Sequence, residues 1–188
     1  MPPAPSSTTR ASPLPPDERR AAIIAAVLPL LIEQGASVTT RQLATAADVS
    51  EGTIFNVFAD KDELVAAAVE TAMDPAPFER SLGEIDPNDS FEQRLTAATV
   101  LIQRRIVDIW RLVSQLGEHH HSSGPPRLPD SPALIALLAS EADRLRLDPR
   151  EAARTLRAFT LALTHPMLAS EPRDAAAVVD VFLRGVHE

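Results

Sequence analysis

An apolar repeat from Phe91 to Leu116 constrains the fold more than any other feature of the sequence. Apolar side chains recur there at steps of three and four residues, which is the spacing of one helix face. The repeat predicts a helix of about 27 residues, roughly 40 Å long at about 1.5 Å per residue. Leu101, Val107 and Trp110 widen its apolar face. A helix with so broad an apolar face packs against several others, so we expect it in the middle of a helical domain.

The rest of the chain shows the same helical period, and no segment alternates apolar and polar residues over the length of a strand. We therefore predict an all-α fold of about eight helices. Pro29 lies inside the first helix and should bend it. Residues suited to cap helices are Thr39 or Thr40, Ser50, Asp60, Ser90 and Asp148. The expected helices cover residues 17–34, 40–47, 51–57, 61–73, 91–116, 133–145, 149–168 and 173–185.

The composition divides the chain into three parts. Residues 1–16 hold six prolines and one charged side chain, Arg10, which predicts a disordered tail. Residues 17–74 are expected to form a domain of short helices, and residues 75–188 a helical bundle that begins with a connection rich in proline and acidic residues. The chain has no cysteine, no apolar run of membrane-spanning length and no signal-peptide pattern. We therefore expect a cytoplasmic protein without disulfides, Cys-ligated zinc or thiol catalysis.

Two short helices joined by a tight turn are predicted between Thr39 and Lys61. The small Ala44 would let the second helix cross the first closely, Val49 would fill the corner, and Ile54 would face the core. This arrangement is what a helix-turn-helix motif requires, here at about residues 40–58. An ordinary helical hairpin in an all-α core is the alternative.

One set of residues in and around this stretch has the spacing of a known family pattern: Gly35, Thr39, Thr40, Leu43, Ala44, Ala47, Val49, Ser50, Gly52, Thr53, Ile54, Phe58, Lys61 and Leu64. With these residues the sequence resembles the TetR family of bacterial transcriptional regulators. The resemblance implies a helix-turn-helix domain that binds a palindromic or near-palindromic operator in double-stranded DNA. It also implies a C-terminal helical domain that binds a small-molecule effector and forms a homodimer, so that the protein would be a ligand-responsive repressor.

The resemblance and the helix geometry together suggest which residues contact DNA. Thr40, Thr53 and Lys61 are expected to hold phosphates. Arg41, Glu51 and Asn56 are expected to read guanine, cytosine and adenine. Alternatively, Asn56 is an ordinary surface residue and Glu51 stabilises the helix N-terminus. The full predicted set is Thr39, Thr40, Arg41, Ser50, Glu51, Gly52, Thr53, Phe55, Asn56 and Lys61.

Three positions depart from the family pattern. Phe55 and Val57 replace a Tyr and a His that the family uses toward phosphate, and Asp48 replaces the usual turn glycine, where a positive φ is expected. Residues 17–73 carry four basic and nine acidic side chains, a net charge of −5 in a chain of net charge −8. Because counterion release drives non-specific affinity for DNA, we expect weak non-specific binding that is sensitive to salt. A helical ligand-binding or interaction protein that has lost DNA binding is the alternative function.

The C-terminal helices supply candidates for an effector pocket and a dimer interface. The pocket candidates are Thr99, Gln103, Trp110, Val113 and Thr160, although Trp110 could instead be a core residue. The last two helices could form a four-helix interface between two subunits. Their apolar residues are Ala153, Leu156, Phe159, Leu163, Met167, Val178, Val179, Phe182, Leu183 and Val186.

No catalytic motif stands out, so we predict that the protein is no enzyme and has no cofactor or metal site. The consecutive His119, His120 and His121 would point about 100° apart on a helix and could not readily share one ion. A solvated helix end is the expected interpretation of these histidines. The arginines at 150, 154 and 157, together with Glu151, are expected to form local ion pairs on an exposed face.

Overall fold

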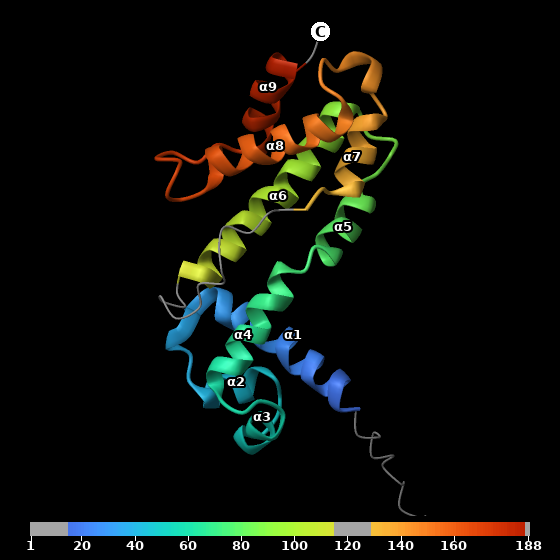
Figure 1. Cartoon of the computed structure of the whole chain (residues 1–188). Coiled ribbons are helices and arrows are strands. Elements are labelled where there is room, and N and C mark those ends of the chain that lie inside the picture. The colour runs from blue at the N-terminus through green and yellow to red at the C-terminus, as the bar shows by residue number, and fades with distance from the viewer. Residues whose placement is uncertain (1–14, 115–128, 187–188) are drawn as a thin grey trace, which may run out of the picture.

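The computed structural model describes residues 15–114 and 129–186 of the chain (Figure 1). Within these ranges the chain forms nine α-helices, two 3-10 turns and no strand, which confirms the all-α fold. None of the described helices combines the length and the apolar character needed to span a membrane. Most of the N-terminal tail and the three consecutive histidines lie outside the described residues, so the expectations for them remain predictions.

Four helices and one 3-10 turn form the N-terminal part of the structure, and their bounds agree with the predicted ones within one or two residues. They are α1 (Pro16–Gln34), the 3-10 turn Gly35–Ser37, α2 (Thr40–Ala46), α3 (Glu51–Val57) and α4 (Lys61–Met73). Pro16 lies at the first helical position, where its missing N–H costs no hydrogen bond. Pro29 lies inside α1 on its exposed side.

Side-chain caps fix the starts of α2, α3 and α4. The Thr39 hydroxyl accepts from the Gln42 amide, and the Gln42 side chain accepts from the Thr39 amide at 2.9 Å, so Thr39 rather than Thr40 caps α2. The Ser50 hydroxyl accepts from the Thr53 amide at 3.1 Å. Asp60 caps α4 in the same way. Each cap satisfies a backbone donor that a helix N-terminus leaves unpaired.

The turn between α2 and α3 depends on one residue with a positive φ. Asp48 has φ 52°, and it is the only non-glycine residue with a positive φ in the described part of the chain. This confirms the expectation drawn from its position in the motif. Asp adopts the left-handed region at a lower energetic cost than most residues, but at a higher cost than Gly. The turn closes through a 3.0 Å hydrogen bond from the Val49 amide to the Ala44 carbonyl.

The C-terminal part contains five helices. They are α5 (Ala76–Gly83), α6 (Phe91–Ser114), α7 (Pro132–Ala139), α8 (Pro149–Thr164) and α9 (Ala175–Val186). Helix α5 falls in the segment that we expected to be a connection. Its prolines stand at its start, where they favour a helix rather than break one. Phe78 and Leu82, one turn apart, pack on the core of this part.

Two predicted helix ends were wrong. Helix α7 stops at Ala139 rather than Leu145, because the last turn tightens through i to i+3 hydrogen bonds and a separate 3-10 turn follows at Ala142–Arg144. Helix α8 stops at Thr164 rather than Leu168. His165 precedes Pro166 and is extended at ψ 127°, because a residue before proline avoids the helical region.

Helix α6 lies in the middle of the molecule, as its apolar repeat predicts. Figure 1 shows α1–α4 gathered near its C-terminal end and α7–α9 near its N-terminal end. Leu95, Ala98 and Ile102 belong to a core that α6 shares with α5, α7, α8 and α9. Leu112, about three to five turns further along the helix, belongs to the core of α1–α4. One helix therefore takes part in both hydrophobic cores.

Polar side chains in the middle of α6 also connect it to its neighbours. Arg105 donates to the carbonyl oxygens of Met73 at 2.9 Å and Asp74 at 3.1 Å, at the C-terminal end of α4. A cation at that end of a helix complements the partial negative charge of the last carbonyls. Gln103 donates to the Thr164 hydroxyl at 3.1 Å and to the Arg173 carbonyl at 2.7 Å, which fixes the end of α8 and the end of the loop that leads into α9.

Candidate DNA-binding site

Helices α2 and α3 pack as a helix-turn-helix on α1 and α4. Leu43 and Ala44 of α2, Ile54 of α3 and Phe58 just after it are buried in one cluster, and Val49 packs against that cluster from the turn. Ala44 contributes only a methyl group, so the two helices approach closely. The opposite side of α3 faces solvent.

The predicted DNA-contacting residues lie at the start of α2, along the outer side of α3 and at the start of α4. Thr39, Arg41, Ser50, Glu51, Gly52, Phe55 and Asn56 are exposed, and Thr40, Thr53 and Lys61 are partly buried. No residue of the set is buried in the core. All ten positions are therefore open to an external partner to some degree.

Several of these polar groups already have partners within the domain. The hydroxyls of Ser50 and Thr53 are 2.8 Å apart and share one hydrogen bond. The Thr39 hydroxyl and the Gln42 side chain hold each other at the start of α2. Only one of the two protons in the Ser50–Thr53 pair remains to be donated to a phosphate, so the pair offers less hydrogen-bonding capacity than two free hydroxyls would.

Arg20 of α1 holds the end of α3 and the start of α4 together, and sequence reasoning missed this role. Its guanidinium lies 4.3 Å from the centre of the Phe58 ring. It forms an ion pair with Glu63 at 2.9 Å and donates to the Val57 carbonyl at 3.2 Å. No spacing rule connects positions so distant in sequence. One of the four basic residues of this domain is therefore engaged in holding the domain together.

Glu63 forms two hydrogen bonds that stabilise the start of α4. Its carboxylate accepts the Ala59 amide at 2.7 Å, while its own amide donates to the Asp60 side chain at 2.8 Å. The backbone hydrogen bond from Ala59, followed by the interaction with Arg20, lowers the pKa of Glu63 from its usual value of 4.5. The two hydrogen bonds resemble a capping box, except that the amide of Ala59, the residue before the cap, is the donor to the Glu63 side chain.

The five predicted pocket residues do not share one environment. Thr99 and Thr160 are fully buried, Gln103 and Trp110 are partly buried, and the Val113 side chain is 39% exposed. Trp110 packs edge-on against His165, with ring centres 4.8 Å apart. Two hollows on the described surface, of about 550 and 470 Å³, lie elsewhere, along the first half of α6 and at the α8–α9 connection.

Half of the predicted dimer residues lie in the core of their own subunit. Ala153, Leu156, Val178, Val179 and Phe182 are buried there, so the expectation that they face a second subunit was wrong. They cover the apolar face of α6, which needs several partner helices. Phe159 and Met167 are exposed, and Leu163 and Leu183 are partly buried. The Val186 side chain lies outside the described residues.

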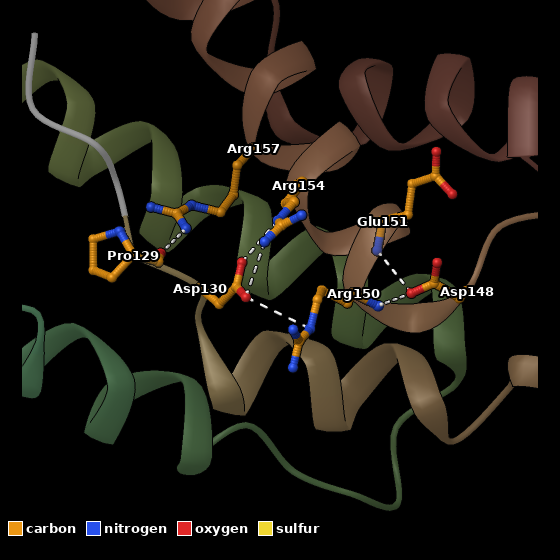
Figure 2. Close-up of polar contacts among 7 residues, drawn as sticks. All are labelled: Pro129, Asp130, Asp148, Arg150, Glu151, Arg154 and Arg157. Carbon is orange, nitrogen blue, oxygen red and sulfur yellow. Dashed lines mark hydrogen bonds and ion pairs between the residues drawn. The ribbon is translucent and has the colours of Figure 1, made fainter.

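Arg150 and Arg154 of α8 pair with Asp130 rather than with Glu151, which corrects the prediction. Arg154 donates two hydrogen bonds to the Asp130 carboxylate, at 2.8 and 3.2 Å (Figure 2). Arg150 forms an ion pair with the same carboxylate at 3.5 Å. Arg157 donates to the Pro129 carbonyl at 2.6 Å. The bond from Arg154 is the main reason that the pKa of Asp130 is lowered. These contacts fasten the chain just before α7 to α8.

Residues 15–114 and 129–186 contain no group of three side chains suited to hold a metal ion.

Comparisons with known proteins agree with this geometry. Residues 23–68 match the family model described as bacterial regulatory proteins, tetR family. A comparison with curated proteins gave no match.

Solved structures resemble nearly the whole chain. A TetR transcriptional regulator from Streptomyces coelicolor is 22% identical, with 89% of this chain and 98% of that chain covered and a TM-score of 0.58. A transcriptional regulator from Rhodococcus sp. Rha1 is 19% identical, with 89% and 97% covered and a TM-score of 0.55. A third structure, described as the molecular basis for control of antibiotic production by bacterial hormones, is 22% identical, with 91% and 98% covered and a TM-score of 0.61. At these identities the similarity concerns the fold.

A helix-turn-helix with an exposed second helix, carried on a helical domain, defines a DNA-binding transcriptional regulator. The family match over residues 23–68, which ends within α4, identifies this N-terminal part of the chain as similar to the TetR family of bacterial regulators.

Replacing Glu63 by Gln should reduce the pH dependence of stability. Because the pKa of Glu63 is lowered in the folded protein, its ionised form stabilises the fold above the ordinary value of 4.5, and this stabilisation disappears as the pH falls through the folded-state value. We expect Glu63→Gln to be less stable than the wild type at pH 7, with the difference closing as the pH falls below 4.5 and through the lowered folded-state pKa of Glu63. Denaturant unfolding across this pH range measures it. Glu70→Gln, at an exposed carboxylate of α4, is the control, and a difference that is the same at every pH would contradict the expectation.

Proposed function

We propose that this regulator is a ligand-responsive repressor that binds a palindromic or near-palindromic operator as a homodimer. The observation that carries the proposal is the outer side of α3, where Glu51, Gly52, Phe55 and Asn56 are exposed while Ile54 is fully buried. A short helix with one face anchored and the other open has the arrangement of a recognition helix in the major groove. A protein that meets the chromosome in this way acts in the bacterial cytoplasm.

Gly52 supports close approach to DNA. A Cβ atom at this position would meet only the Ser50 hydroxyl, at 3.8 Å, so nothing inside the protein requires a glycine there. Gly52 is the second residue of α3, and glycine loses more conformational freedom on folding than any other residue. An external surface that lies against the first turn of α3 accounts for the missing side chain.

The phosphate contacts are proposed to flank this face. Thr40 and Lys61 lie at the starts of α2 and α4, and Thr53 lies between them on α3. Arg41, Glu51 and Asn56 are the proposed base-reading residues. We propose the domain boundary after residue 74, since the apolar cluster of α1–α4 contains only Leu112 from beyond it.

Lys61, the only lysine of the chain, provides the test of DNA docking. Lys61→Ala removes one cation per subunit, so the slope of log K against log salt should fall by about 2 for a dimer, at about 0.9 per phosphate contact. Affinity should drop by similar factors on operator and on random DNA. Asn56→Ala should instead lose discrimination at one base pair and keep the slope. Electrophoretic shifts against duplexes from its own promoter, at several salt concentrations, measure both.

Arg104→Ala is the matched control, because Arg104 is an exposed cation on α6. An unchanged slope for Lys61→Ala in a protein that binds DNA would contradict the docking. A wild type that binds no duplex would favour the alternative, a helical ligand-binding protein that has lost DNA binding, which the net charge of −5 in residues 17–73 also suggests.

A homodimer through α8 and α9 is proposed from side chains that their own subunit leaves uncovered. Phe159 of α8 is 39% exposed and Val181 of α9 is 37% exposed. We expect sedimentation equilibrium at micromolar concentration to give twice the chain mass of 20.3 kDa. Phe159→Glu should give the single mass, because a charge in an apolar interface is costly. Val113→Glu, at an equally exposed valine of α6, should remain dimeric. A wild-type monomer would contradict the dimer, and a dimeric Phe159→Glu would move it away from α8.

The effector response is proposed to pass through α6. Arg105 connects α6 to the last carbonyls of α4, so a ligand that shifts α6 would move α4 and change the spacing of the two recognition helices. The fully buried Thr99 hydroxyl has no hydrogen-bond partner within the protein, and a buried donor of this kind favours a ligand acceptor. A structure of similar fold is described as the molecular basis for control of antibiotic production by bacterial hormones, which supports a proposal of effector control.

A screen of small molecules by Trp110 fluorescence tests this response. Binders should change the emission of Trp110, the sole tryptophan, which lies on α6 two to three turns from Thr99. Thr99→Val should weaken their binding and leave the free energy of unfolding equal or higher, because the variant removes an unsatisfied buried hydroxyl. Binders that leave the emission unchanged and bind Thr99→Val as tightly as the wild type would contradict the pocket.

A further inference from the structure

The recognition face of α3 carries no positive charge. Its exposed residues are Glu51, Gly52, Phe55 and Asn56, which follow one another at helical spacing on one side. The commonest specific contact in the major groove is an Arg or Lys to guanine. Helix α3 contains neither residue type, so its reading of DNA depends on an apolar, a carboxylate and an amide side chain.

Phe55 is the exposed aromatic of this face. Half of its surface is open to solvent, whereas Ile54 beside it and Phe58 one turn later are fully buried. Its ring has no hydrogen-bond donor or acceptor, so it cannot replace a phosphate contact. The only apolar group on a base edge in the major groove is the C5-methyl group of thymine. Burial of the ring against that methyl group removes apolar surface of both partners from water.

Glu51 lies one helical turn before Phe55 on the same face. An ionised carboxylate only accepts hydrogen bonds, and phosphates repel it, so its favourable partners on DNA are amino groups of bases. Cytosine N4 is the amino group that Glu contacts most directly in the major groove. One turn of a helix rises about 5.4 Å, and successive bases are about 3.4 Å apart along one strand. The two side chains therefore reach bases one or two steps apart.

We propose that Phe55 reads a thymine methyl group and Glu51 a cytosine amino group, so that α3 selects a pyrimidine pair in each half-site rather than guanines. This inference rests on the proposed DNA-binding function and specifies the chemistry of the same surface. It also gives a physical reason why α3 can read DNA although it carries one carboxylate and no cation. The favourable contacts of α3 are made with base edges, away from the phosphates.

The test uses full-length protein and a thymine without its methyl group. Duplexes are first selected from a randomised library by wild-type protein. Each thymine of the selected consensus is then replaced singly by deoxyuridine, which keeps base pairing and removes only the methyl group, and dissociation constants are measured. At one thymine per half-site the wild type should bind about fourfold more weakly, the factor that corresponds to burial of one methyl group at about 0.8 kcal/mol. Phe55→Ala should bind the thymine and deoxyuridine duplexes equally.

Two further variants control the interpretation. Phe55→Leu keeps an apolar group and should retain part of the preference for thymine, and Asn56→Ala should retain all of it. Selection repeated with Glu51→Ala should lose the cytosine preference one or two positions from that thymine and keep the thymine itself.

Three results would overturn the inference while the DNA-binding function stands. These are a consensus without thymine, no effect of deoxyuridine at any position, or a deoxyuridine effect of equal size in Phe55→Ala. A selection that enriches no duplex at all would overturn the DNA-binding function together with the inference.

Discussion

The packing of α6 against helices of both parts of the molecule is the constraint on which the rest of the structure depends. Its apolar face is too broad for one partner helix, and α5, α7, α8 and α9 all contribute to covering its first half. Its second half reaches the core of α1–α4 through Leu112. The free energy gained from the hydrophobic effect is proportional to the apolar area removed from water, so burial in both clusters stabilises the position of this helix. The position of the helix-turn-helix relative to the other helices follows from this single element.

Within the helix-turn-helix domain, several charged side chains stabilise the packing of the helices rather than contact DNA. Arg20 contacts the Phe58 ring, the Glu63 carboxylate and the Val57 carbonyl, and so links three helices. Acidic side chains such as Asp60 and Glu63 satisfy the amides at the start of α4. These roles explain why an acidic domain can be stable. They also leave few cations for phosphates, which makes the remaining ones valuable for affinity.

Local signals in the sequence predicted local features correctly. Short-range chemistry determines the caps at Ser50 and Asp60, and the positive φ of Asp48 follows from its place in the motif. The missed features depend on partners far away in sequence. Neither Arg20 nor the pairing of Arg154 with Asp130 follows from any spacing of three or four residues. Prolines caused two errors of opposite kind. The prolines at the start of α5 led us to predict a connection where a helix begins, and the effect of Pro166 was missed, so α8 was predicted too long.

The site could be predicted in outline but not in detail. The outer side of α3 follows from helical period once Ile54 and Phe58 are taken as core, and the predicted DNA contacts all lie away from that core. The predicted dimer residues mostly cover α6, because sequence shows that a side chain is apolar and not which neighbour covers it. Leu112 fills the core of α1–α4 from a helix that belongs mainly to the other core. The N-terminal helices therefore do not complete their core by themselves, and movement of α6 away from them would expose apolar surface there.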